Sequence, residues 1–143
     1  MSNTRHVVVV RKDLDLSPGL LAAQVAHISD AFMRTRIEDG SFVSALVNVA
    51  APVNDKDKIV AKFSKEEMEW MKQPYISVLA VNNGEELQEI VTEAKREGLV
   101  VHEWSDVIPS EILKRPIRVK VGISIGPDDF DKLKMVTGNL PLF

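Results

Sequence analysis

The stretch from Val7 to Phe32 constrains the fold of this chain more than any other part of the sequence. It begins with four consecutive valines, which are too few to span a membrane and whose β-branched side chains favour a strand buried on both faces. A polar connection follows, and Ser17 with Pro18 is typical of the start of a helix. One narrow stripe of that helix is apolar and is expected to face the core: Leu21, Val25, Ile28 and Phe32.

A second stripe of the same helix carries polar side chains. Gln24 and His27 lie three positions apart, beside Leu20, and overlook one edge of the buried face. Side chains of this kind on a helix flank are more often surface or capping groups than catalysts. The pattern alone therefore allows both a site and an ordinary surface.

The rest of the chain alternates apolar strands with amphipathic helices. A capping box at Ser64 predicts a short helix that buries Trp70 and its neighbouring methionines. The segment from Arg118 to Ile125 alternates strictly and predicts a strand with one polar face. The first helix is expected to run over 18–37. Further strands are expected over 75–81 and 99–104, and further helices over 83–96 and 129–136. This succession favours an α/β fold, a three-layer α/β/α sandwich within a single domain of 143 residues.

Composition excludes several classes of function. The chain has no cysteine, which excludes disulfides and thiolate chemistry and is typical of a reducing compartment. Its net charge of −3 gives no overall attraction to nucleic acid, so any RNA contact needs a local basic patch. The three histidines lie on three different elements, which argues against a metal site. No signal segment or membrane span is apparent, and we expect a cytoplasmic protein.

Three blocks of sequence resemble the peptidyl-tRNA hydrolase 2 family. VVRKDL followed by PGLLAAQVAH is similar to the family's opening strand and its G-K-hydrophobic-A-A-Q-x-x-H helix. IGP followed by DKLKMVTGNLPLF resembles its ending, and WMKQPYISVLAV resembles its Q-P-K-V-V-V strand entry. The resemblance covers roughly half the chain. It implies a small, mixed, mostly parallel four-stranded sheet, an inserted element around residues 41–63, and a possible homodimer.

The resemblance also implies hydrolysis of the ester between a peptide and tRNA, with neither metal nor other cofactor. By that resemblance the catalytic residues are Gln24, His27 and Asp106, of which Asp106 would stand for the aspartate of the family's D-A-G-x-T segment. Asp13 matches the aspartate of the family's D-L pair and is expected to form a turn. From the sequence itself, the free amides at the helix start suit a phosphate or a carbonyl. The expected substrate-binding residues are Arg11, Ser17, Gly19, Leu20, Arg115, Arg118 and Lys120.

Two departures from the family pattern bear on activity. The family's functional lysine falls on Leu20, which cannot offer a cation to a phosphate or an oxyanion. The D-A-G-x-T-Q segment is replaced by WSDVIPSEILKRP, which has no threonine. The basic residues from Lys114 to Lys120 could restore the lost charge in space, although a solvated loop and strand face is the more common role of such a cluster.

Two functions of different classes follow. The first is a divergent peptidyl-tRNA hydrolase that acts in translation. The second is a non-enzymatic member of the fold that binds RNA, a small ligand or a protein partner. A hydrolase that acts on another ester or amide is a third, weaker alternative.

Overall fold

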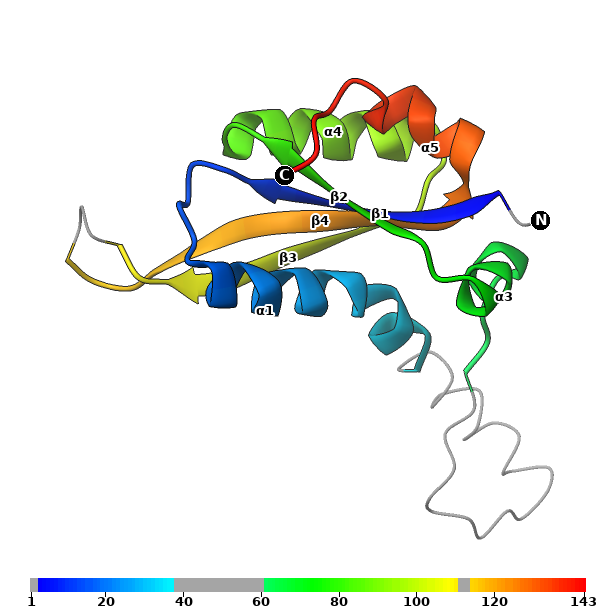
Figure 1. Ribbon diagram of the computed structural model, residues 1–143, viewed down its shortest axis with the longest axis horizontal. Coiled ribbons are helices and arrows are strands. Elements are labelled where there is room, and N and C mark those ends of the chain that lie inside the picture. Colours follow the sequence, from blue (N-terminus) through cyan, green and yellow to red (C-terminus); the bar gives the residue numbers. More distant parts are fainter. Residues whose placement is uncertain (1–2, 38–60, 111–113) are drawn as a thin grey trace, which may run out of the picture.

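The computed structural model describes residues 3–37, 61–110 and 114–143. Within these ranges the chain is an α/β structure built on one four-stranded sheet (Figure 1). The strands are β1 (Thr4–Arg11), β2 (Ile76–Val81), β3 (Val101–Ile108) and β4 (Ile117–Asp129). The helices are α1 (Pro18–Ser29), α3 (Lys65–Lys72), α4 (Gly84–Arg96) and α5 (Phe130–Thr137), and residues 31–37 form a further helical segment. The expected inserted element lies outside the described residues except at 61–63.

The sheet has the order β2-β1-β4-β3 and is mixed. The strand β1 is interior, with Val8, Val9 and Val10 fully buried, which confirms the interpretation of the valine run. It pairs with β2 in parallel and with β4 antiparallel, while β3 and β4 are also antiparallel. The expectation of a mostly parallel sheet is therefore wrong. The β3–β4 connection, residues 109–116, is too short for the crossover that a parallel pair needs.

Helices pack against both faces of the sheet (Figure 1). Val7 and Val9 face α4 and α5, whereas Val8 and Val10 face α1. Ile28 of α1 and Phe32 just beyond it are fully buried, as the apolar stripe predicts, whereas Leu21 and Val25 of the same stripe are only half-buried. The chain end lies along the outer edge of β2, where Phe143 N–H donates to the Val78 carbonyl at 3.0 Å.

A register shift in β4 changes which side chains face α1. Trp104 of β3 pairs with Gly122, but Ser105 pairs with Lys120, so Val121 is an additional residue on β4. Val121 packs with the α1 face, whereas Ile123 packs with the opposite core. The prediction that the segment alternates strictly, with one polar face, is therefore wrong. Residues 121–127 are buried on both faces because helices cover the sheet on both sides.

Two further expectations about helices are corrected by the structure. The first helix is interrupted at Asp30 rather than running unbroken to residue 37, because the chain makes a turn there before the helical segment 31–37. The capping box at Ser64 is present and Trp70 is buried, as expected. Met68 and Met71 were also expected to be buried, but both are exposed. Only one face of α3 packs against the rest of the structure.

A buried histidine lies where α3 and the 31–37 segment meet the sheet. His6 of β1 is fully buried, and its ring makes edge contacts with Phe32 and Trp70. Neither ring nitrogen has a hydrogen-bond partner among the described residues. Burial, with a smaller contribution from nearby His102, lowers the pKa of His6 from 6.5 to about 4. The folded protein therefore holds this ring in its neutral form.

This burial predicts a loss of stability in mild acid. The unfolded chain protonates His6 near pH 6.5 and the folded chain only near pH 4. The stabilisation is thus complete above pH 6.5 and is lost as the pH falls toward 4, by roughly 3 kcal/mol in all. Urea denaturation of wild type and His6→Leu between pH 7.5 and 4.5 should show a weaker pH dependence in the variant. His27→Gln, at an exposed histidine, is the control, and equal slopes for wild type and His6→Leu would contradict the prediction.

Candidate active site

Two of the three expected catalytic residues lie in direct contact. Gln24 of α1 is only 2% exposed, and its Nε2 donates to Asp106 Oδ2 of β3 at 2.9 Å. The other carboxylate oxygen, Oδ1, accepts the backbone N–H of Val107 at 2.7 Å. Residues 82 positions apart in the sequence are thus joined by a charge-assisted hydrogen bond. We define this contact as the Gln24–Asp106 pair.

Trp104 completes the surroundings of the pair. Its indole Nε1 donates to Gln24 Oε1 at 2.8 Å. The ring of His27, the third expected catalytic residue, stacks on the indole with centroids 5.0 Å apart and planes at 22°. Arg34 lies over the same indole at 5.3 Å and also donates to the His27 carbonyl. His27 and Arg34 are both exposed, so this side of the group is open to solvent.

The hydrogen bonds to Asp106 determine its charge state. The bond from Gln24 lowers the pKa of Asp106, and the Val107 N–H and the charges of His27 and Arg118 lower it further. The carboxylate is therefore ionised at neutral pH and accepts hydrogen bonds on both oxygens. A carboxylate of lowered pKa is a weak base, which suits it better to holding and orienting a water molecule than to removing its proton unaided.

A cavity of about 500 Å³ lies at the start of α1, and neither Gln24 nor Asp106 lines it. Leu20 lines it one helical turn before Gln24, and Ile108 lines it two residues beyond Asp106 on the same face of β3. Ser17 also lines the cavity, and its side chain makes no capping hydrogen bond. The wall of the cavity is mainly apolar and includes two carboxylates. The lining residues are Asp13, Leu14, Asp15, Leu16, Ser17, Leu20, Ile108, Pro109, Ser110 and Ile117.

Gly19 lies beside this cavity on the exposed side of the helix start. A Cβ built on Gly19 would meet no atom within 4 Å, so the helix backbone is open to solvent there. No packing contact therefore requires a glycine at this position. An unobstructed backbone would let a substrate group approach the first turn of α1.

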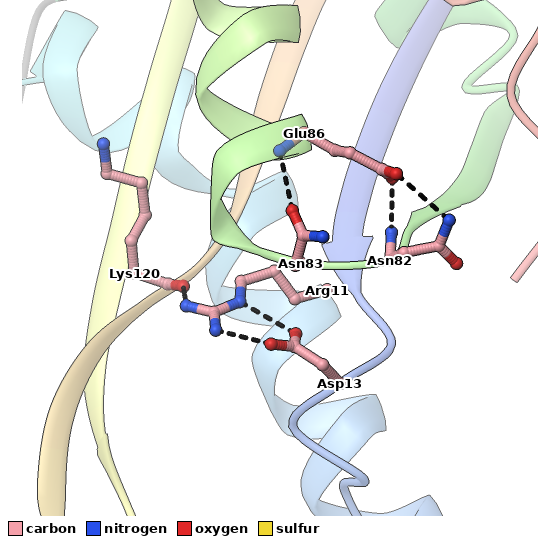
Figure 2. Close-up of polar contacts among 6 residues, drawn as sticks. All are labelled: Arg11, Asp13, Asn82, Asn83, Glu86 and Lys120. Atoms are coloured by element: carbon pink, nitrogen blue, oxygen red, sulfur yellow. Dashed lines mark hydrogen bonds and ion pairs between the residues drawn. The ribbon is translucent and has the colours of Figure 1, made fainter.

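Two of the expected substrate-binding cations lie on the other side of the sheet. Arg11 makes a two-pronged ion pair with Asp13 and donates to the Lys120 carbonyl, beside the start of α4 (Figure 2). The Lys120 ammonium bonds with Gln88 and Glu103. Both groups are therefore engaged near α4, away from the Gln24–Asp106 pair. The bidentate contact with Asp13 also raises the pKa of Arg11 and lowers that of Asp13.

The remaining expected cations are exposed near the end of β3 and the start of β4. Arg118 pairs with Val107 across the β3–β4 ladder, next to Asp106. Arg115 lies in the connection between the strands. Among the ion pairs of the described residues, neither Arg115 nor Arg118 has a carboxylate partner. They form the basic edge of the candidate site.

The sequence analysis did not identify Trp104 and Arg34 as part of the site. The available signal was the spacing of Trp104 and Asp106, which lie two apart and therefore on one face of a strand. Ending the expected strand at residue 104, four residues early, concealed that relation. Arg34 gave no such signal, because its contact with Trp104 depends on the turn at Asp30.

Comparison with known proteins defines the class of this α/β chain. The family model described as "Peptidyl-tRNA hydrolase PTH2" matches residues 4–143. The chain belongs to the peptidyl-tRNA hydrolase 2 family.

Three archaeal relatives match over almost their entire lengths, each named peptidyl-tRNA hydrolase. The protein of Methanopyrus kandleri is 35% identical over 140 residues, covering 96% of this chain and 97% of the relative. The protein of Nanoarchaeum equitans is 32% identical over 139 residues, covering 97% of this chain and 98% of the relative. The protein of Methanothermobacter thermautotrophicus is 31% identical over 139 residues, with 96% and 98% covered.

Proposed function

We propose that this protein hydrolyses peptidyl-tRNA, and that the reaction takes place at the Gln24–Asp106 pair. Family membership supports the substrate class. The observation that carries the site is the buried amide of Gln24 bonded to the ionised carboxylate of Asp106. A cavity large enough for an acyl group begins one helical turn away, at Leu20.

In the proposed reaction a water oxygen attacks the ester carbonyl carbon that joins the peptide to the tRNA ribose. The bond between that carbon and the ribose oxygen breaks, the ribose oxygen takes a proton, and a free peptide carboxyl group remains. Asp106 holds and orients the water, and His27, exposed on the adjacent stack, is placed to exchange a proton with it. Gln24 acts through Asp106, because both ends of its buried amide are engaged within the protein.

The proposal also covers the cellular compartment and the oligomeric state of the protein. We place it in the cytoplasm, supported by the absence of cysteine. No helix in the described parts of the chain is long and apolar enough to cross a membrane. A homodimer is also proposed, supported by large apolar side chains exposed near the outer edge of β2: Tyr75, Ile76, Leu142 and Phe143.

The decisive experiment measures the release of free tRNA from an N-blocked aminoacyl-tRNA. Wild type should cleave the ester, and Asp106→Asn should slow cleavage on the order of a hundredfold, because the amide keeps the shape of the side chain but not its charge. Asp131→Asn, at an exposed carboxylate of α5, is the matched control and should retain the wild-type rate. Equal rates for Asp106→Asn and wild type would remove Asp106 from the reaction.

A specific observation favours the second candidate function, a binding protein on the same fold. Leu20 lines the cavity where the resembled family has its functional lysine, and two carboxylates border the same space. Without a cation there, the cavity neither attracts a phosphate nor stabilises an oxyanion.

Restoring the cation distinguishes the two candidates. A lysine at position 20 would extend from the same helix stripe as Gln24, one turn away. Leu20→Lys should raise the rate of peptidyl-tRNA cleavage about tenfold, which corresponds to about 1.4 kcal/mol. Leu20→Met controls for the change in shape, and adding Gln24→Ala should abolish the gain. A folded Leu20→Lys protein with no activity, like an inactive wild type, would favour the binding protein.

The basic edge predicts how tRNA binding responds to salt. If Arg115 and Arg118 contact phosphates, affinity should fall as salt rises, and replacing both with alanine should reduce the slope by about one unit per lost contact. Lys62→Ala with Lys65→Ala, at exposed cations near α3, is the matched control. An unchanged slope in the Arg115→Ala, Arg118→Ala protein would show that these arginines are solvated surface groups.

A further inference from the structure

Trp104 holds the Gln24 amide from the side opposite Asp106. The amide oxygen accepts the indole N–H at 2.8 Å, and the amide nitrogen donates to the carboxylate at 2.9 Å. Gln24 is 2% exposed, so water competes little for either contact. The three side chains therefore form one directed chain of hydrogen bonds, from indole to amide to carboxylate.

The direction of this chain is fixed by the indole. An indole N–H can only donate, and an ionised carboxylate can only accept. If the amide turned over, its oxygen would face the negative carboxylate and its NH₂ group would face the indole N–H, so both hydrogen bonds would be lost. A buried amide with a donor at one end and an acceptor at the other has a single favourable orientation.

The indole is itself held in place by its neighbours. His27 stacks on it at 5.0 Å, and the Arg34 guanidinium lies 5.3 Å from its centroid. Arg34 also donates to the His27 carbonyl at 2.8 Å, which ties the helical segment 31–37 back to α1. The indole N–H thus points at a fixed place on α1.

We propose that Trp104 is a positioning residue for this hydrolase: its indole N–H orients the Gln24 amide so that the amide hydrogen is always presented to Asp106. This inference rests on the proposed function. It assigns no contact with the substrate to Trp104, whose effect passes through Gln24 to the carboxylate.

A consequence for pH follows from the same hydrogen bonds. The largest contribution to the lowered pKa of Asp106 is the bond from Gln24. Without the indole anchor the amide can turn away, and the pKa of Asp106 should then rise toward its ordinary value. The other charges that act on this carboxylate, His27 and Arg118, remain in the variant and do not replace the lost bond.

The chain offers a matched control, because its second tryptophan makes an equivalent bond elsewhere. Trp70 Nε1 donates to the Tyr75 carbonyl at 2.8 Å, next to α3. Trp104→Phe and Trp70→Phe each keep an aromatic ring and remove one indole hydrogen bond. Only Trp104→Phe removes the anchor of Gln24. A merely structural role for Trp104 would make the two variants behave alike.

The experiment compares these variants by two readouts. The first is the titration of the Asp106 carboxyl carbon by NMR, which needs no activity. The second is the pH profile of kcat and KM for cleavage of an N-blocked aminoacyl-tRNA. In Trp104→Phe the Asp106 titration and the acid limb of kcat should both move to higher pH. The kcat at the acid end should fall about tenfold, while KM is unchanged. Trp70→Phe should leave both curves in place.

Gln24→Met provides a second variant should Trp104→Phe fold poorly. It removes the amide but keeps the length of the side chain, and should shift both curves as Trp104→Phe does. The double variant should show no further shift, because the two residues act in series. Unshifted curves in Trp104→Phe, or in Gln24→Met where that variant is used, would overturn the inference and leave the proposed function standing. An inactive wild type would instead overturn the proposed function, and the positioning role of Trp104 in that reaction with it.

Discussion

The close approach of α1 to the sheet at Gly122 supports everything described at the candidate active site. A Cβ on Gly122 would lie 2.8 Å from Ile28 Cδ1 and 2.5 Å from the Val9 carbonyl oxygen, so a side chain there would push the helix away. Because position 122 has none, Ile28 reaches the sheet and is fully buried. Gln24 lies one turn earlier on the same helix and is likewise buried.

The register shift of β4 lies next to the contact between Gly122 and Ile28. Gly122 pairs with Trp104, and the additional residue Val121 follows directly. On β3 the alternation is undisturbed, so Trp104 and Asp106 both face α1 and meet Gln24 together. The packing of α1 on the sheet and the hydrogen bonds of Gln24 therefore depend on the same part of the structure. A closely packed helix brings an amide into a dry position, and the neighbouring strand supplies a donor and an acceptor for its two ends.

The electrostatics of the site follow from that arrangement. The hydrogen bond from Gln24 lowers the pKa of Asp106 most, and the Val107 N–H and nearby His27 and Arg118 lower it further. The cavity at the start of α1 is walled mainly by leucine, isoleucine and proline, which suits an acyl group better than a phosphate. Pro109 and Ser110 line this cavity and also the neighbouring hollow beside Arg115. The apolar and basic regions therefore meet at the β3–β4 connection.

Gln24 and Asp106 were catalytic candidates through the resemblance to the peptidyl-tRNA hydrolase 2 family. The sequence by itself determined the strand of valines, the buried Ile28 and Phe32 of the first apolar stripe, and the capped helices α3 and α4. These features depend on local periodicity, capping chemistry and short motifs, which are written in consecutive residues. Only the tertiary structure decided that Arg11 and Lys120 lie near α4, that Trp104 anchors Gln24, and that β4 changes face at Val121. Strand pairing and side-chain contacts between a helix and the sheet join residues that are far apart in sequence. No local sequence pattern can predict them.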